Sequence, residues 1–291
     1  MDERTALTLL GGTVEGAGDD AAVAGDRVLT TDMLHETTDF PDGTTRYTAG
    51  WRAVGASLSD VAAMGADAAA AVAAYAAPEF DREELTAFVG GASDVCEAVG
   101  AEYVGGDLDE HGEFTVATTA LGETTDPVRR SGSTPGDRLC VTGTLGRSAA
   151  ALRLFRQGDT ERANDLFRFE PRVAAGRAVA PHATAMMDSS DGLARSVHQL
   201  AAASDCGFAV ESAAVPVDDA VDDVAANETD RRELGLFFGE DFELVFTVPD
   251  EDLGAVRDAA TVAVTPVGTV TDEAVTLDGD PMSDRGFTHG D

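Results

Sequence analysis

The sequence predicts two α/β (α+β) domains joined by a short connector. Segments with the apolar spacing of helices alternate with segments typical of strands along both halves of the chain. The stretch TTDPVRRSGSTPGD, rich in Thr, Ser, Pro and Gly, separates the halves. The length of 291 residues suits two domains of ordinary size, and a hydrophobic fraction of 43% is enough for two buried cores. We place the boundary near residue 133, with domains at 1–133 and 134–291.

The first half opens with a strand, RVLTTDML, entered from the Gly-rich turn EGAGDD. A helix is expected from Ala49 to about Ala66, since apolar residues recur there every three or four positions. The next segment, DAAAAVAAYAAP, is ambiguous: Ala favours a helix, but a short apolar run closed by Pro78 also fits a buried strand. The recurring apolar residues of the helix are Trp51, Val54, Leu58 and Val61.

The rest of the first half alternates in the same way. Asp81 and Glu84 form a capping-box-like start for a second helix, which Gly100 ends. EYVGGD is expected to be a strand followed by a turn, and EFTVATTALG alternates like a strand.

The second half repeats the alternation. RLCVTG is a predicted strand, TLGRSAAALRLF opens a helix, and the segment from Asp188 to Ala203 is a loop leading into another helix. Further strands are expected at FAVES, FELVFTV and VAVTPVGTV, and the acid cluster DDAVDDV is expected to be a solvated helix face or loop.

The charge balance excludes several functions. The chain has 54 acidic residues against 20 basic ones, all Arg, for a formal charge of −34. Without Lys it can have neither a Walker A loop nor a Schiff-base site. A nucleic-acid surface is also excluded, because binding phosphates needs a basic stripe. So acidic a chain predicts adaptation to high salt, where self-repulsion is screened.

The cysteines and apolar runs indicate the compartment. Cys96, Cys140 and Cys206 are odd in number and far apart, which favours neither a disulfide framework nor a zinc site. No apolar run reaches about 18 residues, and we see no signal-peptide h-region. We expect a soluble cytoplasmic protein that does not bind membranes.

Six aspartates lie among apolar residues and glycines, whereas most acids of the chain have polar neighbours. An unpaired carboxylate near a core is costly unless it meets a cation. Together with the hydroxyls of Thr30, Thr31 and Ser190 they form a set of hard oxygen ligands without Cys or His, which favours Mg²⁺ over Zn²⁺. The six are Asp20, Asp32, Asp60, Asp107, Asp188 and Asp191.

Magnesium in so acidic a protein points to a phosphate substrate. Arg129 and Arg130 are candidates to grip phosphate oxygens, although an exposed linker pair is an equal alternative. The turn VTGTLGRS offers amides to an anion at a helix N-terminus, but a tight structural turn is the simpler interpretation. His35, His198 and Trp51 are interpreted as structural.

Read in order, eight segments resemble thiamine-monophosphate kinases, over about residues 16 to 270. Single motifs are shared with aminoimidazole ribonucleotide synthetase and selenophosphate synthetase, whereas the combination LSDVAAMGA, RSGSTPGD and GEDFEL is typical of the thiamine enzymes. The segments are GAGDDAAV, LTTDML, GWRAVGASLSDVAAMGA, VGGD, VRRSGSTPGDRLCVTGTLGRSAAAL, PRVAAGRAVA, MMDSSDGLARSVHQLAAASDCG and FFGEDFELVFTV.

The resemblance implies ATP-dependent phosphorylation of thiamine monophosphate to thiamine diphosphate. It implies a two-domain aminoimidazole ribonucleotide synthetase-like fold whose N-terminal sheets pair into a barrel across a homodimer, and it makes the Ala-rich segment a strand. Its implied Mg²⁺ ligands are Asp20, Thr30, Thr31, Asp32, Asp60, Asp107, Asp188 and Asp191. Its implied ATP contacts are Gly106, Asp107, Arg130 and Ser190, and the residues expected to carry catalysis are Asp60, Asp107, Arg130 and Asp188.

On the thiamine side, Glu240 in GEDFEL is the implied contact, and the sequence departs from the family elsewhere. Asp39 stands where the family often has a substrate-touching His. Leu108 and Asp109 follow GGD where the family often has Thr-Thr. Asp284 stands where we align a Trp, leaving Phe287 as the nearby aromatic.

The acceptor is itself a phosphate monoester, mostly dianionic near neutral pH, so no general base is needed. We therefore expect direct in-line transfer with several Mg²⁺ ions and no phosphoenzyme. A selenophosphate synthetase is excluded, because the first cysteine is Cys96 and Lys is absent. A ribonucleotide synthetase-like enzyme and a non-catalytic metal- or nucleotide-binding module remain as alternatives.

Overall fold

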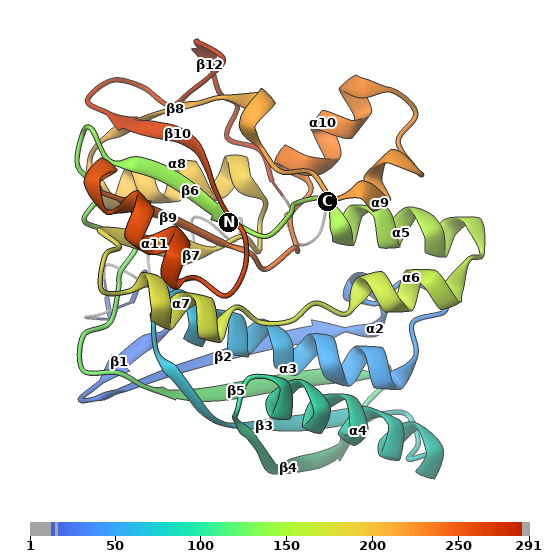
Figure 1. Cartoon of the computed structure of the whole chain (residues 1–291). Helices are drawn as coiled ribbons and strands as arrows, with labels where there is room; N and C mark the ends of the chain where they lie inside the picture. Colours follow the sequence, from blue (N-terminus) through green and yellow to red (C-terminus); the bar gives the residue numbers. More distant parts are fainter. Residues whose placement is uncertain (1–12, 15–16, 287–291) are drawn as a thin grey trace.

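The computed structural model describes residues 13–14 and 17–286. Two mixed layers of strands and helices stack on each other, with the N-terminal half forming the lower layer in Figure 1. None of the helices in this described part is both long and apolar enough to cross a membrane.

The lower layer contains a five-stranded sheet in the order β1-β2-β5-β3-β4. Strands β3 and β4 are parallel, and the other neighbours are antiparallel. The strands are β1 (Ala22–Ala24), β2 (Arg27–His35), β3 (Asp67–Ala77), β4 (Glu102–Glu110) and β5 (Thr115–Glu123). The helices of this half are α2 (Glu36–Asp39), α3 (Arg46–Ala63) and α4 (Arg82–Ala98).

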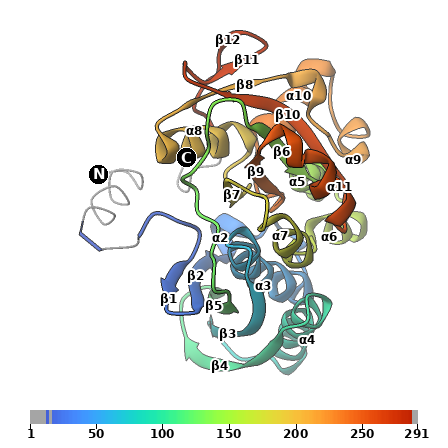
Figure 2. The same cartoon turned by 60° about the vertical axis from the view of Figure 1, so that its left-hand side comes forward.

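Helices α3 and α4 cover one face of this sheet, as Figure 2 shows. They approach closely because glycines lie at the contact: a Cβ on Gly50 would come within 2.1 Å of the Phe88 carbonyl oxygen, and one on Gly91 within 1.9 Å of that of Tyr47. The other face keeps large apolar side chains exposed, which include Leu29, Met33 and Val104.

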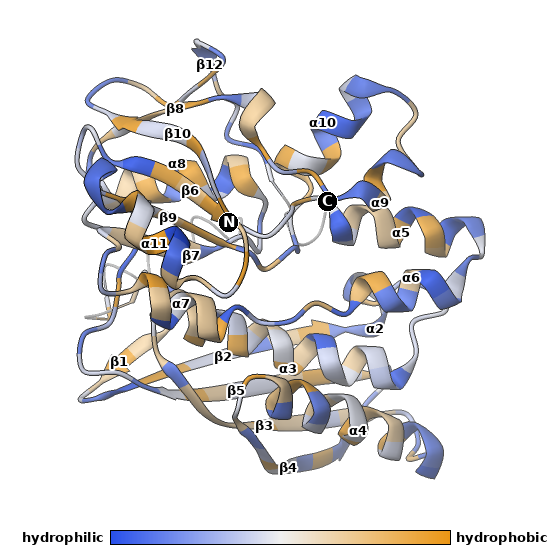
Figure 3. Cartoon of the chain, in the orientation of Figure 1, coloured by the Kyte–Doolittle hydropathy of each residue, from blue (hydrophilic) through white to orange (hydrophobic). Residues whose placement is uncertain are grey.

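The upper layer contains a seven-stranded sheet in the order β12-β11-β8-β10-β6-β9-β7. Most of its strands are largely hydrophobic, whereas β12 and α10 carry many hydrophilic residues (Figure 3). The strands are β6 (Arg138–Thr142), β7 (Ala185–Asp188), β8 (Gly207–Val210), β9 (Leu244–Val248), β10 (Val264–Thr271), β11 (Thr276–Leu277) and β12 (Asp280–Pro281). The α-helices are α5 (Arg147–Gln157), α6 (Thr160–Phe167), α7 (Val173–Val179), α8 (Leu193–Ser204), α9 (Asp219–Asp222), α10 (Glu228–Phe237) and α11 (Leu253–Ala259).

Helix α3 joins the two layers. Its last residues, Ala62 and Ala63, belong to a buried cluster that also contains Val173 and Val179 of α7 and Phe246 of β9. One end of the N-terminal helix is therefore part of the C-terminal core. The predicted boundary near residue 133 falls in the segment between β5 and β6, and the division into domains there stays a prediction.

The sequence predicted most elements correctly. The Ala-rich segment is the strand β3, as the resemblance implied, because pairing with β4 and β5 and packing against α3 and α4 outweigh the helix propensity of Ala. The turn expected after EYVGGD was wrong: β4 runs on to Glu110, since its pairing with β3 continues through Gly106 and Asp107. The acid cluster at 218–224 forms the short helix α9.

Candidate functional site

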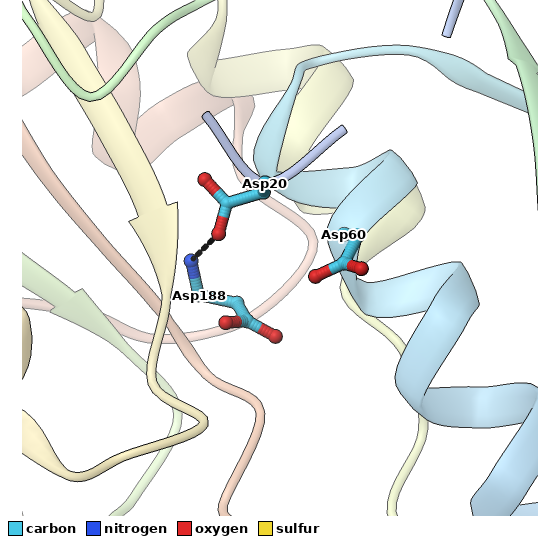
Figure 4. Close-up of side chains that lie close together, drawn as sticks. All are labelled: Asp20, Asp60 and Asp188. Carbon is cyan, nitrogen blue, oxygen red and sulfur yellow. Dashed lines mark hydrogen bonds between the residues drawn. The ribbon is translucent and has the colours of Figure 1, made fainter. Parts of the chain in front are cut away.

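Three of the predicted aspartates lie together where α3, β7 and the loop before β1 meet. Asp20, Asp60 and Asp188 each offer a carboxylate oxygen, and these oxygens lie within 4.8 Å of one another. Figure 4 shows Asp60 on the last turn of α3 facing Asp188, with the Asp188 amide donating to Asp20. Asp188 is only 1% exposed. The cluster therefore brings three acidic side chains together in a place where Asp188 is buried and Asp60 half-buried.

Arg130 supplies positive charge at the edge of this cluster. Its guanidinium donates two hydrogen bonds to the two carboxylate oxygens of Asp20, at 3.1 and 2.9 Å. The neighbouring Arg129 pairs with Asp19 at 2.7 Å and is more exposed. The structure thus separates the two predicted arginines, because Arg130 reaches the cluster whereas Arg129 fastens the loop that carries Asp20.

Hydroxyl groups hold the carboxylates in place. Ser59 donates to Asp188 at 2.7 Å, and Thr30 donates to Asp60. Ser57 donates to Asp32 at 2.5 Å and is 0% exposed. Helix α3 therefore both contributes Asp60 and positions two aspartates from other elements. Sequence reasoning missed Ser57 and Ser59, although small polar residues inside an apolar helix were a signal.

Asp60 and Asp188 of the cluster, and the neighbouring Asp32, have raised pKa values. Burial, reinforced by the neighbouring aspartates, raises the pKa of Asp60 well above its usual range. Burial likewise raises the pKa of Asp188 to about 7, with the Asp20 charge adding to it. Burial also raises the pKa of Asp32. Asp60 lies in the last turn of α3, at the negative end of the helix dipole, and this environment favours a cation.

These residues fit a hard divalent cation. The donor set consists of carboxylate and hydroxyl oxygens, which Mg²⁺ prefers. One oxygen of Asp188, Oδ1, is buried and has no hydrogen-bond partner in the described part of the chain. A buried carboxylate oxygen is normally satisfied, so an ion at this position would supply the interaction it lacks.

A cavity of about 100 Å³ adjoins the cluster and brings further predicted residues together. Ser190 and Asp191 line it on one side and Asp32 on another. Asp39 and Glu240 line this cavity and also a larger neighbouring one of about 470 Å³, so the two spaces meet at these carboxylates. One oxygen of Asp39 accepts hydrogen bonds from the His35 amide and the Thr38 hydroxyl, so Asp39 also caps its own turn.

The turn VTGTLGRS is structural. The amides of Gly146 and Ser148 at the start of α5 donate to the two carboxylate oxygens of Asp241, at 2.6 and 3.0 Å. A side chain of the protein therefore takes the place of the anion considered above. Burial raises the pKa of Asp241 to about 7. Sequence reasoning missed Asp241, because it lies between Glu240 and Phe242 and not among small apolar residues.

Three predicted residues lie away from the cluster within one chain. Thr31 is on the opposite face of β2 from Thr30 and Asp32, where its hydroxyl donates to the Thr118 carbonyl oxygen. Gly106 and Asp107 are on β4, which β5 and β3 separate from β2. With strands about 4.8 Å apart, Asp107 lies roughly 14 Å from β2. Gly106 and Asp107 line a cavity of about 660 Å³ that passes around the edge strand β4, from Phe88 on the α4 side to Val104 on the other face.

The remaining candidates behave as structural groups or cannot be placed. His35 contacts the Thr115 hydroxyl at 3.0 Å, and His198 contacts the Met282 carbonyl oxygen at 3.1 Å. Trp51 donates to the Phe169 carbonyl oxygen. Phe287 lies outside the described residues. The metal, nucleotide and substrate roles given to individual residues stay predictions.

Comparisons with known proteins identify the family. The model of the AIR synthase related protein N-terminal domain matches residues 18–124, and that of the C-terminal domain matches residues 134–279. A protein of Halobacterium salinarum called thiamine-monophosphate kinase is 66% identical over 99% of this chain and 100% of its own. A Methanospirillum hungatei protein of the same name is 39% identical over 99% of both chains.

Solved structures agree. "AaThiL complexed with AMPPCP and TMP" superposes with a TM-score of 0.91 at 28% identity, covering 99% of this chain and 97% of that one. Thiamine-monophosphate kinase from Stenotrophomonas maltophilia superposes with a TM-score of 0.82 at 30% identity, covering 95% and 94% of the two chains. The resemblance found in the sequence is therefore confirmed. The chain belongs to the thiamine-monophosphate kinases of the AIR synthase related family.

Proposed function

We propose that this enzyme transfers the γ-phosphoryl group of ATP to the phosphate of thiamine monophosphate, giving thiamine diphosphate. The observation that carries the proposal is the buried cluster of Asp20, Asp60 and Asp188 with Arg130 at its edge. Such a group of carboxylates with an arginine suits the handling of phosphates through divalent cations. The relatives named thiamine-monophosphate kinase support the same reaction.

The metal ligands we propose come from both halves of the chain. Mg²⁺ bound there would neutralise phosphate oxygens and hold them for in-line attack. The residues' own task is to keep several carboxylates close despite their repulsion, which the hydroxyls of Ser57, Ser59 and Thr30 do. The proposed ligands are Asp20, Thr30, Thr31, Asp32, Asp60, Asp107, Asp188 and Asp191.

The acceptor needs no general base. The second pKa of a phosphate monoester is about 6, so the thiamine phosphate is already mostly a dianion at neutral pH. The remaining difficulty is bringing two anions together. Arg130 is placed to relieve it, because its guanidinium can exchange the Asp20 carboxylate for a phosphate oxygen. We propose direct transfer without a phosphoenzyme, and retention of configuration at the γ-phosphorus would contradict it.

The nucleotide is proposed to contact Arg130 and Ser190 with its phosphates, and Gly106 and Asp107 on β4. The 660 Å³ cavity beside β4, which Tyr103 and Phe88 also line, is large and apolar enough for a nucleoside. It lies at the opposite edge of the sheet from the carboxylate cluster. One chain by itself therefore offers two separated parts of a site.

A homodimer would join these parts. The face of the five-stranded sheet that α3 and α4 leave open carries Leu29, Met33 and Val104, which are 46%, 59% and 58% exposed. Asp107 pairs with the exposed Ala74, so it belongs to the same face. We propose that these faces of two chains pair into a barrel. The pairing brings the partner subunit's Asp107 to the carboxylate cluster of the first chain.

Complementation between inactive variants tests this arrangement. Asp60→Asn and Asp107→Asn should each be inactive alone. When the two are unfolded and refolded together, half of the dimers are mixed, and each mixed dimer has one intact composite site, so about a quarter of wild-type activity should return. Sedimentation of the mixture shows whether dimers form. Dimers that recover no activity would show that Asp60 and Asp107 act within one chain.

The thiamine moiety is proposed to occupy the 470 Å³ cavity between α2 and α5. Asp39 and Glu240 line it, and carboxylates suit a substrate with a cationic thiazolium ring and an aminopyrimidine donor. Phe287 is the proposed aromatic contact. The proposed compartment is the cytoplasm, where ATP is available and the cysteines Cys96, Cys140 and Cys206 stay reduced.

The test of the activity is product formation from thiamine monophosphate, ATP and Mg²⁺ in molar KCl, with EDTA as control. Thiamine diphosphate that forms and disappears with EDTA is the expected result. ATP hydrolysis without thiamine diphosphate would move the acceptor to another compound, and formylglycinamidine ribonucleotide is then the next substrate to try. Folded protein that binds ATP without turnover would favour the non-catalytic module.

A further inference from the structure

Arg52 is a buried charge that the proposed chemistry does not use. It projects from α3 and is 1% exposed, although a guanidinium strongly prefers water. Its partners lie far away in the sequence. One terminal nitrogen donates to the Phe167 carbonyl oxygen at 2.9 Å, and the other donates to the Glu240 carboxylate at 2.8 Å and to the Glu240 carbonyl oxygen at 3.2 Å.

The segment that Arg52 contacts has an unusual backbone. Glu240 has φ +59° and Phe242 has φ +55°, which are left-handed conformations, and Gly239 between α10 and these residues has φ +87°. For a residue with a Cβ this conformation is strained, so it persists only where surrounding contacts impose it. Residues 239–243, which we call the Glu240 loop, must therefore be held by their neighbours.

The contacts that hold this loop come from several elements. The Ser148 hydroxyl of α5 donates to the Glu240 carbonyl oxygen at 2.6 Å, and the Glu240 amide donates to the Ser190 carbonyl oxygen. The ring of Phe242 stacks on Phe169 at 4.2 Å between centroids. Arg52 lies at the centre: its guanidinium is 3.6 Å from the Phe167 ring and 5.3 Å from that of Phe242.

The acidic side chains of the Glu240 loop point in two directions. Asp241 and Glu243 point to the scaffold, where they bind the start of α5 and Arg172. Glu240 instead faces the two joined cavities. Arg52 binds both the carbonyl oxygen and the carboxylate of Glu240, so it fixes the backbone of this residue and the direction of its side chain together.

We propose that Arg52 is a positioning residue for the thiamine side of the active site, where it holds Glu240 in the orientation that binds thiamine monophosphate. This inference rests on the proposed role of Glu240 as a substrate contact. Arg52 itself touches no cavity of the proposed site.

Helix α3 carries both Arg52 and Asp60, so it also connects the Glu240 loop to the carboxylate cluster. Asp60 follows Arg52 by eight residues on the same helix, which is a separation of about 12 Å along the axis. One rigid element therefore sets the distance between the carboxylate cluster, where phosphoryl transfer is proposed, and the anchor of the thiamine-binding loop. Arg52, in the first half of α3, binds the loop to this helix, and Ser59 and Asp60, in its second half, bind Asp188 and Thr30.

The test is Arg52→Lys. Lysine keeps the charge, but its ammonium is a point donor that cannot serve the Phe167 carbonyl and both oxygen groups of Glu240 in the fork geometry of a guanidinium. We expect the dissociation constant of thiamine monophosphate, measured by calorimetry without ATP, to rise about tenfold. The KM for thiamine monophosphate should rise with it, while the KM for ATP stays within about twofold.

Two variants keep the result interpretable. Arg153→Lys is the matched control, since Arg153 makes a bidentate pair with Asp230 on α10, away from the Glu240 loop, and should change neither constant. If Arg52→Lys does not fold, Ser148→Ala removes the hydroxyl that donates to the Glu240 carbonyl and accepts from Arg52, and it should raise the dissociation constant of thiamine monophosphate about threefold. The fluorescence of Trp51, the one tryptophan of the chain, reports the packing against Phe169 in each variant.

Glu240→Gln separates failure of this inference from failure of the proposed site. If Glu240→Gln weakens binding of thiamine monophosphate but Arg52→Lys lowers only the melting temperature, the positioning role is refuted and the contact stands. If Glu240→Gln leaves binding unchanged, the substrate contact itself is wrong and the role of Arg52 is refuted with it. Equal rises in the KM for ATP and for thiamine monophosphate in Arg52→Lys would also refute it, because they would indicate general loosening.

Discussion

Magnesium should stabilise this protein, and by more at pH 8 than at pH 6. The metal-free cluster keeps carboxylates close together in a buried place, where burial raises the pKa of Asp188 to about 7. An acid whose pKa is higher in the folded than in the unfolded chain stabilises the fold below its unfolded pKa, and that contribution is lost as the pH rises through the folded value. The metal-free protein should therefore lose stability between about pH 4 and pH 7.

The size of the magnesium effect follows from linkage. An ion present at about 100 times its dissociation constant stabilises the folded state by about 2.7 kcal/mol. At pH 6 the ion must displace a proton from Asp188, which weakens binding about tenfold and reduces the gain to about 1.4 kcal/mol. At roughly 2–4 °C per kcal/mol, the melting temperature should rise by about 5–11 °C at pH 8 and about half as much at pH 6.

The assay is thermal unfolding followed by circular dichroism at constant molar KCl, with and without MgCl₂, at both pH values. Asp60→Asn should lose most of the magnesium effect, whereas Asp126→Asn, an exposed aspartate of the connector, should keep it. Equal stabilisation at pH 6 and pH 8 would refute the argument from the raised pKa of Asp188. Full stabilisation of Asp60→Asn would remove Asp60 from the ligand set.

Three further predictions concern catalysis, salt and packing. Asp60→Asn should lower turnover at least a hundredfold while circular dichroism shows an unchanged fold, and wild-type turnover would contradict its role. The melting temperature of the wild-type protein should rise steadily from low to molar KCl, because the formal charge of −34 repels itself at low salt, and a flat dependence would contradict salt adaptation. Gly91→Ala should lower the free energy of unfolding by about 2–4 kcal/mol in urea titrations, because its Cβ would lie 1.9 Å from the Tyr47 carbonyl oxygen, whereas Gly254→Ala, with open space around it, should change it little.

The cluster could be predicted from the sequence because its aspartates lie in apolar segments, where an acidic residue is unusual. Asp60 lies inside an apolar helix and Asp188 is the last residue of an apolar strand, so the sequence alone indicates a cation near each. The alternation of side chains along a strand also places Thr30 and Asp32 on one face of β2 and Thr31 on the other, and the ligand roles of all three stay predictions.

Arg52 and Asp241 could not be predicted in the same way. In the segment GWRAVG, an arginine is an ordinary helix residue, and its burial arises only when Phe167 and Glu240, more than 100 residues away, pack against it. Asp241 has acidic and aromatic neighbours, so its partners at the start of α5 leave no local trace in the sequence. Local pattern identifies a residue that differs in polarity from its sequence neighbours, and it misses a residue whose partners are far away in the sequence.

The negative charge of the chain repels its phosphate-bearing substrates at long range, whereas cationic groups of the site attract them at short range. Both ATP and thiamine monophosphate carry negative phosphates, and a chain with charge −34 repels them in dilute salt. At molar ionic strength the screening length falls to about 3 Å, so only groups in near contact still act on a phosphate. Arg130, 2.9 Å from Asp20, is such a group, and so is any cation held by the buried carboxylates. An acid surface suited to salt is therefore compatible with phosphate chemistry, because the same salt that the surface needs removes the repulsion that the substrates would otherwise meet.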